Sequence, residues 1–207
     1  MSDRPIGRNG QAQVVGNRQS EAALAWMAIG LVASRAPRAV VQNAGMPVIT
    51  VPLLAQAQHS VGMLDLQAKA ARCDSIHARQ PGLLYSVLVL QRYGASMAQI
   101  ELVLDLLLVF DEAMCASGRT WPTITEDDQE RCLKRVTGRV RFVEGLAPAQ
   151  LTQAVTDHMG SHPETPMLAL VFGKLRDAGQ LAIETDAEKM VVLAALNLVE
   201  CIADATG

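Results

Sequence analysis

Three carboxylates recur at helical spacing in the middle of the chain, and they are the first residues whose types and spacing could do chemistry. They are Glu101, Asp105 and Glu112. On a helix of about 100° per residue they fall at about 0°, 40° and 20°, so they share one face. No lysine or arginine lies between Ser96 and Gly118 to offset them. Such a face could be solvated, pair with basic groups, or hold metal ions.

The next expected helix carries the complementary charge. Arg131, Lys134 and Arg135, with Arg141 further on, span about 100° of its circumference. A short loop would make the two helices antiparallel neighbours. We expect a solvated face or an ion-pair seam inside this hairpin. The alternatives are a charge seam that binds a partner and a di-metal carboxylate site, which lacks the Glu-x-x-His element of such bundles.

Two i,i+4 pairs resemble helical metal ligands in spacing only. His158 and His162 are separated by Gly160, and no glutamate follows the first histidine as in HExxH. Cys73 and His77 form a lone CxxxH next to a turn-forming Gln-Pro-Gly. We expect neither pair to bind metal, so the sequence predicts no cofactor and no metal site.

Motifs for nucleic-acid binding and for catalysis are missing from the sequence. Residues 93–100 resemble the entry of a helix-turn-helix, but the helix that follows is apolar and acidic, which phosphate would repel. No GxSxG, phosphate loop or GxGxxG is present. We therefore expect nucleic-acid binding to be absent and the chain to be non-enzymatic, with a metal-dependent helical enzyme as the third interpretation.

Composition indicates a folded bacterial protein. Of 207 residues, 50% are hydrophobic and 19% charged, which suits a domain with a real core. Arginine outnumbers lysine by 14 to 4, as in proteins of GC-rich bacteria, and the four cysteines form no CxxC pair. Free thiols favour the cytoplasm. The apolar run Ala22–Ala33 resembles a signal peptide and supports export as the minority interpretation. No apolar run reaches the ~18 residues of a membrane span.

The pattern predicts an all-α fold, a single mixed bundle of about seven to nine helices. Residues 1–19 form a flexible basic arm and 20–207 one helical domain, with a short hairpin or irregular segment near residues 37–52, where three prolines lie. One helix is expected over 53–72, and Asp74 is expected to cap a short turn. Capping boxes at Ser96/Gln99 and Thr185/Glu188 begin the two longest later helices. Further helices are expected at 21–35, 82–93, 126–144, 148–160 and 166–178.

Charge is divided unevenly along the chain. Residues 1–95 hold nine basic and four acidic side chains, a net of +5, whereas residues 96–207 hold nine and seventeen, a net of −8. This split indicates either pairing of the two halves or contact between copies. We therefore expect a protein that acts through protein contacts or self-association, as an assembly or regulatory component. The alternative is a bundle that binds an apolar small molecule in a Leu-, Val- and Met-lined interior.

Overall fold

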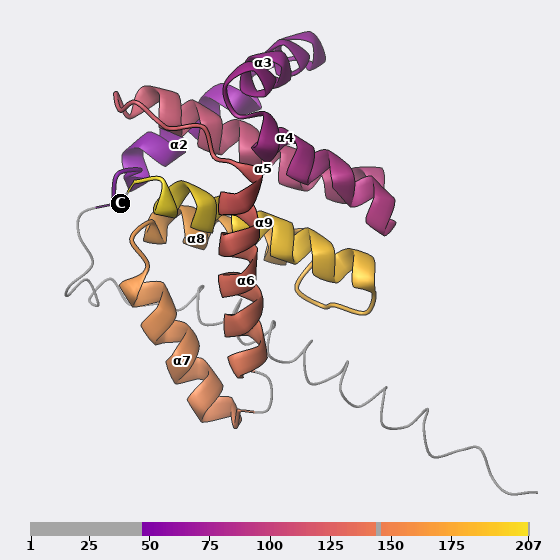
Figure 1. Ribbon diagram of the computed structural model, residues 1–207, viewed down its shortest axis with the longest axis vertical. Helices are drawn as coiled ribbons and strands as arrows, with labels where there is room; N and C mark the ends of the chain where they lie inside the picture. The colour runs from indigo at the N-terminus through magenta and orange to yellow at the C-terminus, as the bar shows by residue number, and fades with distance from the viewer. Residues whose placement is uncertain (1–46, 144–145, 207) are drawn as a thin grey trace, which may run out of the picture.

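The computed structural model describes residues 47–143 and 146–206, and this part of the chain is all-helical, as the sequence predicts (Figure 1). Within these residues eight α-helices and one 3-10 helix form a single bundle. Their bounds are α2 Val51–Gly62, α3 Leu66–Arg79, α4 Pro81–Leu88, η1 Val89–Tyr93, α5 Met97–Ala116, α6 Glu126–Val143, α7 Pro148–Ser161, α8 Thr165–Asp177 and α9 Asp186–Asp204. The expected arm 1–19, the helix at 21–35 and the signal-like run lie outside the described residues.

Helix α9 is the centre of the bundle. It packs against α4, η1, α5, α6 and α8, and it crosses α6 in Figure 1. Between Val191 and Ala203 every residue but Ala194 is buried. A helix that is apolar on nearly all sides is stable only when neighbours cover it on all sides. The second long apolar helix, α5, supplies one of these walls and itself packs on α2.

Local sequence signals fix the ends of the long helices. Ser96 and Gln99 satisfy each other's backbone groups at the start of α5, and Thr185 and Glu188 do the same for α9. Gly94 ends η1 with φ 85°, a left-handed conformation that a side chain would strain. These predicted boundaries are confirmed.

The prediction of a single helix over residues 53–72 is wrong, because two separate helices form there. Helix α2 ends at Gly62, and α3 begins after Asp65, whose carboxylate accepts a hydrogen bond from the Ala68 N–H at 2.8 Å. This N-cap outweighs the continuous apolar stripe that suggested one helix. Helix α3 then continues through Asp74, so Asp74 begins no separate turn.

The proline-rich stretch is described only from Pro47 onward. Residues 47–50 are non-helical, but no strand forms there, and Val51 and Pro52 begin α2. Proline fits the first turn of a helix because the N–H it lacks would have no helical partner. Of the two alternatives predicted for this stretch, residues 47–50 form the irregular segment and no hairpin strand, and residues 37–46 lie outside the described residues. Helix α7 runs through Gly160 to Ser161, and Glu164 is the N-cap residue of α8.

Truncating a core residue of α5 should test this packing. Leu107 is 1% exposed, so Leu107→Ala should lower the free energy of unfolding by about 3 kcal/mol, through lost transfer energy and a residual cavity. Leu66, at the start of α3, is 84% exposed, and Leu66→Ala should change the free energy of unfolding by no more than about 0.5 kcal/mol. Urea unfolding followed by circular dichroism measures both values. Equal losses in the two variants would contradict the described packing.

Candidate functional site

The acidic face of α5 lies against α3. Lys69 Nζ donates to Asp105 Oδ1 at 2.8 Å, and Arg72 forms an ion pair with Glu112. Glu101 is exposed at the start of this face. Ile76 is the one buried residue of α3, which also packs against α4, and these ion pairs add to its contact with α5.

Asp111 lies deeper than the three acids singled out from the sequence. Its carboxylate is 6% exposed and accepts two hydrogen bonds of 2.8 Å from Arg79 Nη2. Burial raises the pKa of Asp111, and the nearby guanidinium groups of Arg79 and Arg72 only partly offset this, so the pKa stays above its ordinary value. This ion pair between an exposed guanidinium and a buried carboxylate links the end of α3 to α5.

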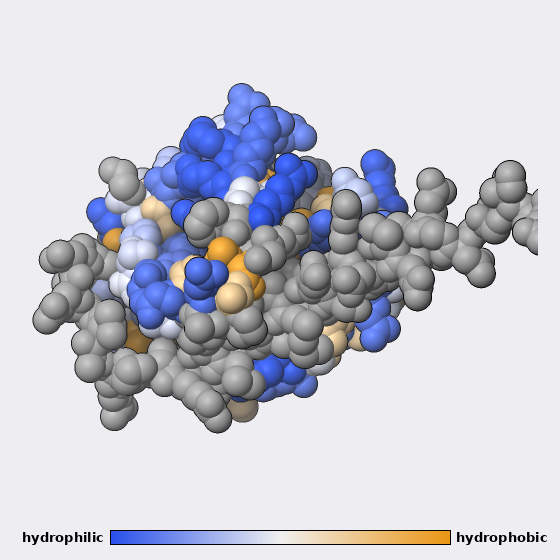
Figure 2. All heavy atoms as spheres, turned by 90° about the horizontal axis from the view of Figure 1, so that it is seen from below, coloured by the Kyte–Doolittle hydropathy of each residue, from blue (hydrophilic) through white to orange (hydrophobic). Residues whose placement is uncertain are grey.

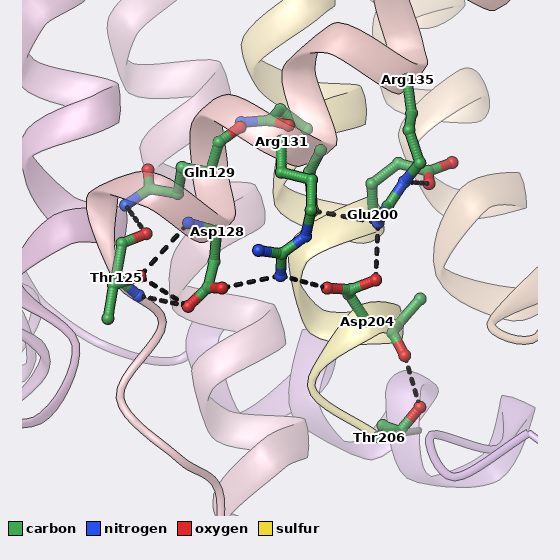
Figure 3. A network of polar contacts seen from close by, with 11 residues as sticks. Thr125, Asp128, Gln129, Arg131, Arg135, Glu200, Asp204 and Thr206 are labelled. Atoms are coloured by element: carbon green, nitrogen blue, oxygen red, sulfur yellow. Dashed lines mark hydrogen bonds and ion pairs between the residues drawn. The ribbon is translucent and has the colours of Figure 1, made fainter.

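The basic face of α6 pairs with its own helix and with α9 (Figure 3). Arg131 bridges Asp128 at 2.7 Å and Asp204 at 2.8 Å, and Arg135 donates to the other oxygen of Asp204 at 2.7 Å. Lys134 pairs with Glu130 one turn earlier. The ion-pair seam expected between Glu101, Asp105 and Glu112 on one side and Arg131, Lys134 and Arg135 on the other is thus replaced by two separate networks.

The physical reason is the length and anchoring of the connection between α5 and α6. Trp121 Nε1 donates to the last turn of α5, at Met114 O, and Gln80 holds the segment at Pro122 O and at the Ile124 N–H. Gln80 is itself buried. These bonds direct α6 away from α5 and onto α9, where it makes its main helix contact. The length of a loop predicts only that the two helices it joins are neighbours. It carries no information on hydrogen bonds that anchor the loop elsewhere.

Glu200 of α9 is the centre of a buried polar cluster that sequence reasoning missed. Its side chain is 8% exposed, forms an ion pair with Arg139 and lies 3.3 Å from His162 Nε2. Burial raises the pKa of Glu200, but hydrogen bonds from His162 and Arg139 and the charge of Arg139 outweigh it, and the pKa lies below its ordinary value. The sequence held one signal for this cluster, because Glu200 is a lone acid within the apolar run of the last helix.

His162 is held by both of its ring nitrogens. Nδ1 accepts a hydrogen bond from the Glu164 N–H at 3.1 Å, so Nδ1 carries no proton and the proton lies on Nε2, facing Glu200. His158 packs edge-on against it, with ring centroids 5.6 Å apart. Burial lowers the pKa of His158 to about 4, with the charge of Arg139 as the next cause. With both nitrogens engaged, His162 has none left for a metal ion or a substrate.

The other weak candidate pair separates. His77 Nε2 lies 2.8 Å from Tyr85 Oη, and the two rings meet edge to face. Cys73 is partly buried, and burial raises the pKa of its thiol, which disfavours the reactive thiolate. Across residues 47–143 and 146–206, no three His, Cys, Asp or Glu side chains converge as metal ligands would.

One face of the molecule carries large apolar side chains without cover from the described residues. Tyr85, Leu88 and Val89 share one side of the helical stretch formed by α4 and η1, by their i, i+3 and i+4 spacing. Tyr93 of η1 and Met97 of α5 follow, and the five side chains are between 36% and 72% exposed. We call these five residues the α4–η1 face. In the view from below in Figure 2, most of the described surface in sight is hydrophilic, with one hydrophobic group near the centre and smaller ones at the margins. None of the described helices has the length and apolarity needed to cross a bilayer.

Removing the buried carboxylate should cost far more than removing an exposed one. Glu200→Ala leaves Arg139 and His162 without their partner and should lower the free energy of unfolding by about 2–3 kcal/mol. Asp105 is 45% exposed, so Asp105→Ala should cost no more than about 1 kcal/mol. Chemical denaturation at pH 7 measures both. A loss at Glu200 as small as that at Asp105 would contradict the cluster.

His158 should make stability depend on pH. Its pKa falls from about 6.5 in the unfolded chain to about 4 in the fold, so the unfolded chain binds more protons between these values. Stability due to this group is therefore complete above pH 6.5 and is lost as the pH falls toward 4. His158→Gln should reduce the slope of unfolding free energy against pH over this range. An unchanged slope would show that His158 is not buried as described.

Comparison with known proteins adds no identity to these observations. No protein-family model, curated protein or solved structure matches the chain. The side chains themselves carry the functional argument: two charge networks, a buried Glu200–His162 pair joined by the exposed Arg139, and an exposed apolar face.

Proposed function

We propose that the chain acts through protein–protein contact, and that the contact is with a second copy of itself through the α4–η1 face. The observation that carries this proposal is the run of exposed apolar side chains at Tyr85, Leu88, Val89 and Tyr93. Grouped apolar residues of this size on a surface mark interaction sites more often than isolated ones do. Covering each half-exposed side chain contributes roughly 1 kcal/mol.

The charge of the face supports a second copy as the occupant. Between Pro81 and Met97 the sequence holds a single charged residue, Arg92, and no acid. A strongly acidic or basic partner would gain little from such a surface. A second copy presents the same nearly uncharged surface, and a two-fold contact pairs the face with itself.

The polar groups of the described chain support association over reaction chemistry. Asp105, Asp111 and Glu112 are paired with α3, and Asp204 and Glu200 are paired with α6. A catalytic acid or base needs a free position from which to reach its substrate. The most buried of these groups are instead engaged by protein partners on adjacent helices.

A charge placed in the centre of the face should separate the copies. Native protein should elute at twice the 22.2 kDa chain mass in size-exclusion chromatography with light scattering at high micromolar concentration. Leu88→Asp should elute as the monomer, because an aspartate there would be buried against an apolar surface. Tyr93→Ser should also weaken the dimer, so its measured mass should shift toward that of the monomer.

Met63→Asp is the matched control. Met63 is 76% exposed but follows α2, outside the face, so this variant should remain dimeric. Circular dichroism should show the same helix content in all four proteins. A native monomer at about 200 µM, or equal masses for the Leu88 and Met63 variants, would reject the proposal.

A further inference from the structure

We infer a binding site for a compact carboxylate, of the size of an aromatic acid, in the pocket between α2, α5 and α8. The pocket has a volume of about 150 Å³. Its apolar lining comes from three helices, with Val61 on α2, Leu102, Leu106 and Val109 on α5, and Leu170 on α8. Val61, Leu106 and Val109 are themselves buried, so these side chains form a floor and not a surface patch.

The volume decides the size of the ligand. An apolar cavity of about 150 Å³ in another protein holds benzene and excludes water. A benzene-sized group matches the volume of this pocket, which unlike that cavity is open at its mouth, whereas a long acyl chain exceeds it. The floor consists of leucine and valine methyl groups, which offer dispersion contacts and no hydrogen bonds to an aromatic or branched group.

The rim decides the charge of the ligand. The polar lining consists of Lys69 of α3, Lys174 of α8, Asp105 of α5 and Gln58 of α2. Lys69 donates one hydrogen bond to Asp105, which leaves two of its three donors. Lys174 is exposed and forms no ion pair with any residue the structure describes. A carboxylate at the mouth can accept from both ammonium groups while its apolar part enters the floor.

Two acids oppose this arrangement, Asp105 in the lining of the pocket and Glu101 beside it. Glu101 lies one turn before Asp105 and acts on Lys69 through its charge, although it does not line the pocket. The two acids lie toward Lys69, so the positive potential of the mouth is greatest near Lys174. We therefore assign the main interaction with the ligand carboxylate to Lys174, and we assign Lys69 a second, weaker contact.

Benzoate is the probe for this site, and benzyl alcohol is its uncharged counterpart. Methyl NMR spectra of the full chain, titrated to about 20 mM, should show benzoate shifting Val61, Leu106, Val109 and Leu170, with a dissociation constant on the order of 1 mM or tighter. Lys174→Gln should weaken benzoate about fivefold and change benzyl alcohol less than about twofold. Palmitate should leave these methyl groups unshifted.

Two variants separate the site from general effects. Lys189→Gln removes an exposed lysine of α9 outside the pocket and should leave benzoate affinity unchanged. Leu170→Phe, at a partly buried position of the floor, should fill the pocket and abolish both ligands while the fold, checked by circular dichroism, persists. Absence of methyl shifts at the highest benzoate concentration, equal binding by native protein and Lys174→Gln, or binding of palmitate at these methyl groups would overturn the inference.

Discussion

The burial of α9 constrains the rest of the molecule. A helix covered by neighbours on nearly all sides must find partners inside the protein for each polar group it carries. Glu200 finds Arg139 and His162, and Asn197 Nδ2 donates to Gln129 O at 3.3 Å, although its Oδ1 has no partner among the described residues. These contacts fix how α6 lies on α9, and with it the direction of the basic face.

Each charge network combines exposed ion pairs with one buried carboxylate, Asp111 on the α3–α5 side and Glu200 on the α6–α9 side. On the α3–α5 side, Lys69 and Asp105 are partly exposed, so their attraction is screened by water and salt. On the α6–α9 side, Glu200 is buried and would be costly to leave unpaired. The uneven charge of the sequence is thus in part an internal pairing of the two halves, since α3 precedes residue 95 and α5 follows it.

Hydrophobic periodicity and capping signals predicted most of the helices. They could not predict which charged side chains pair with one another. The capping boxes at Ser96 and Thr185 placed α5 and α9 correctly, because both signals are local. The break at Asp65 was missed because the apolar stripe continues across it, and a single N-cap decided the outcome. The partners of Glu101, Asp105, Glu112, Arg131 and Arg135 depend on loop anchors such as Gln80 and Trp121, which only the folded chain reveals.

Glu164 joins the entry of the described chain to its far half. Both carboxylate oxygens accept backbone N–H groups, from Val48 at 2.9 Å and Ile49 at 3.1 Å, and the residue is 1% exposed. Burial raises the pKa of Glu164 despite these bonds. These two hydrogen bonds tie the residues that lead into α2 to the N-cap of α8, so a displacement at the start of either helix has to move the other or break them.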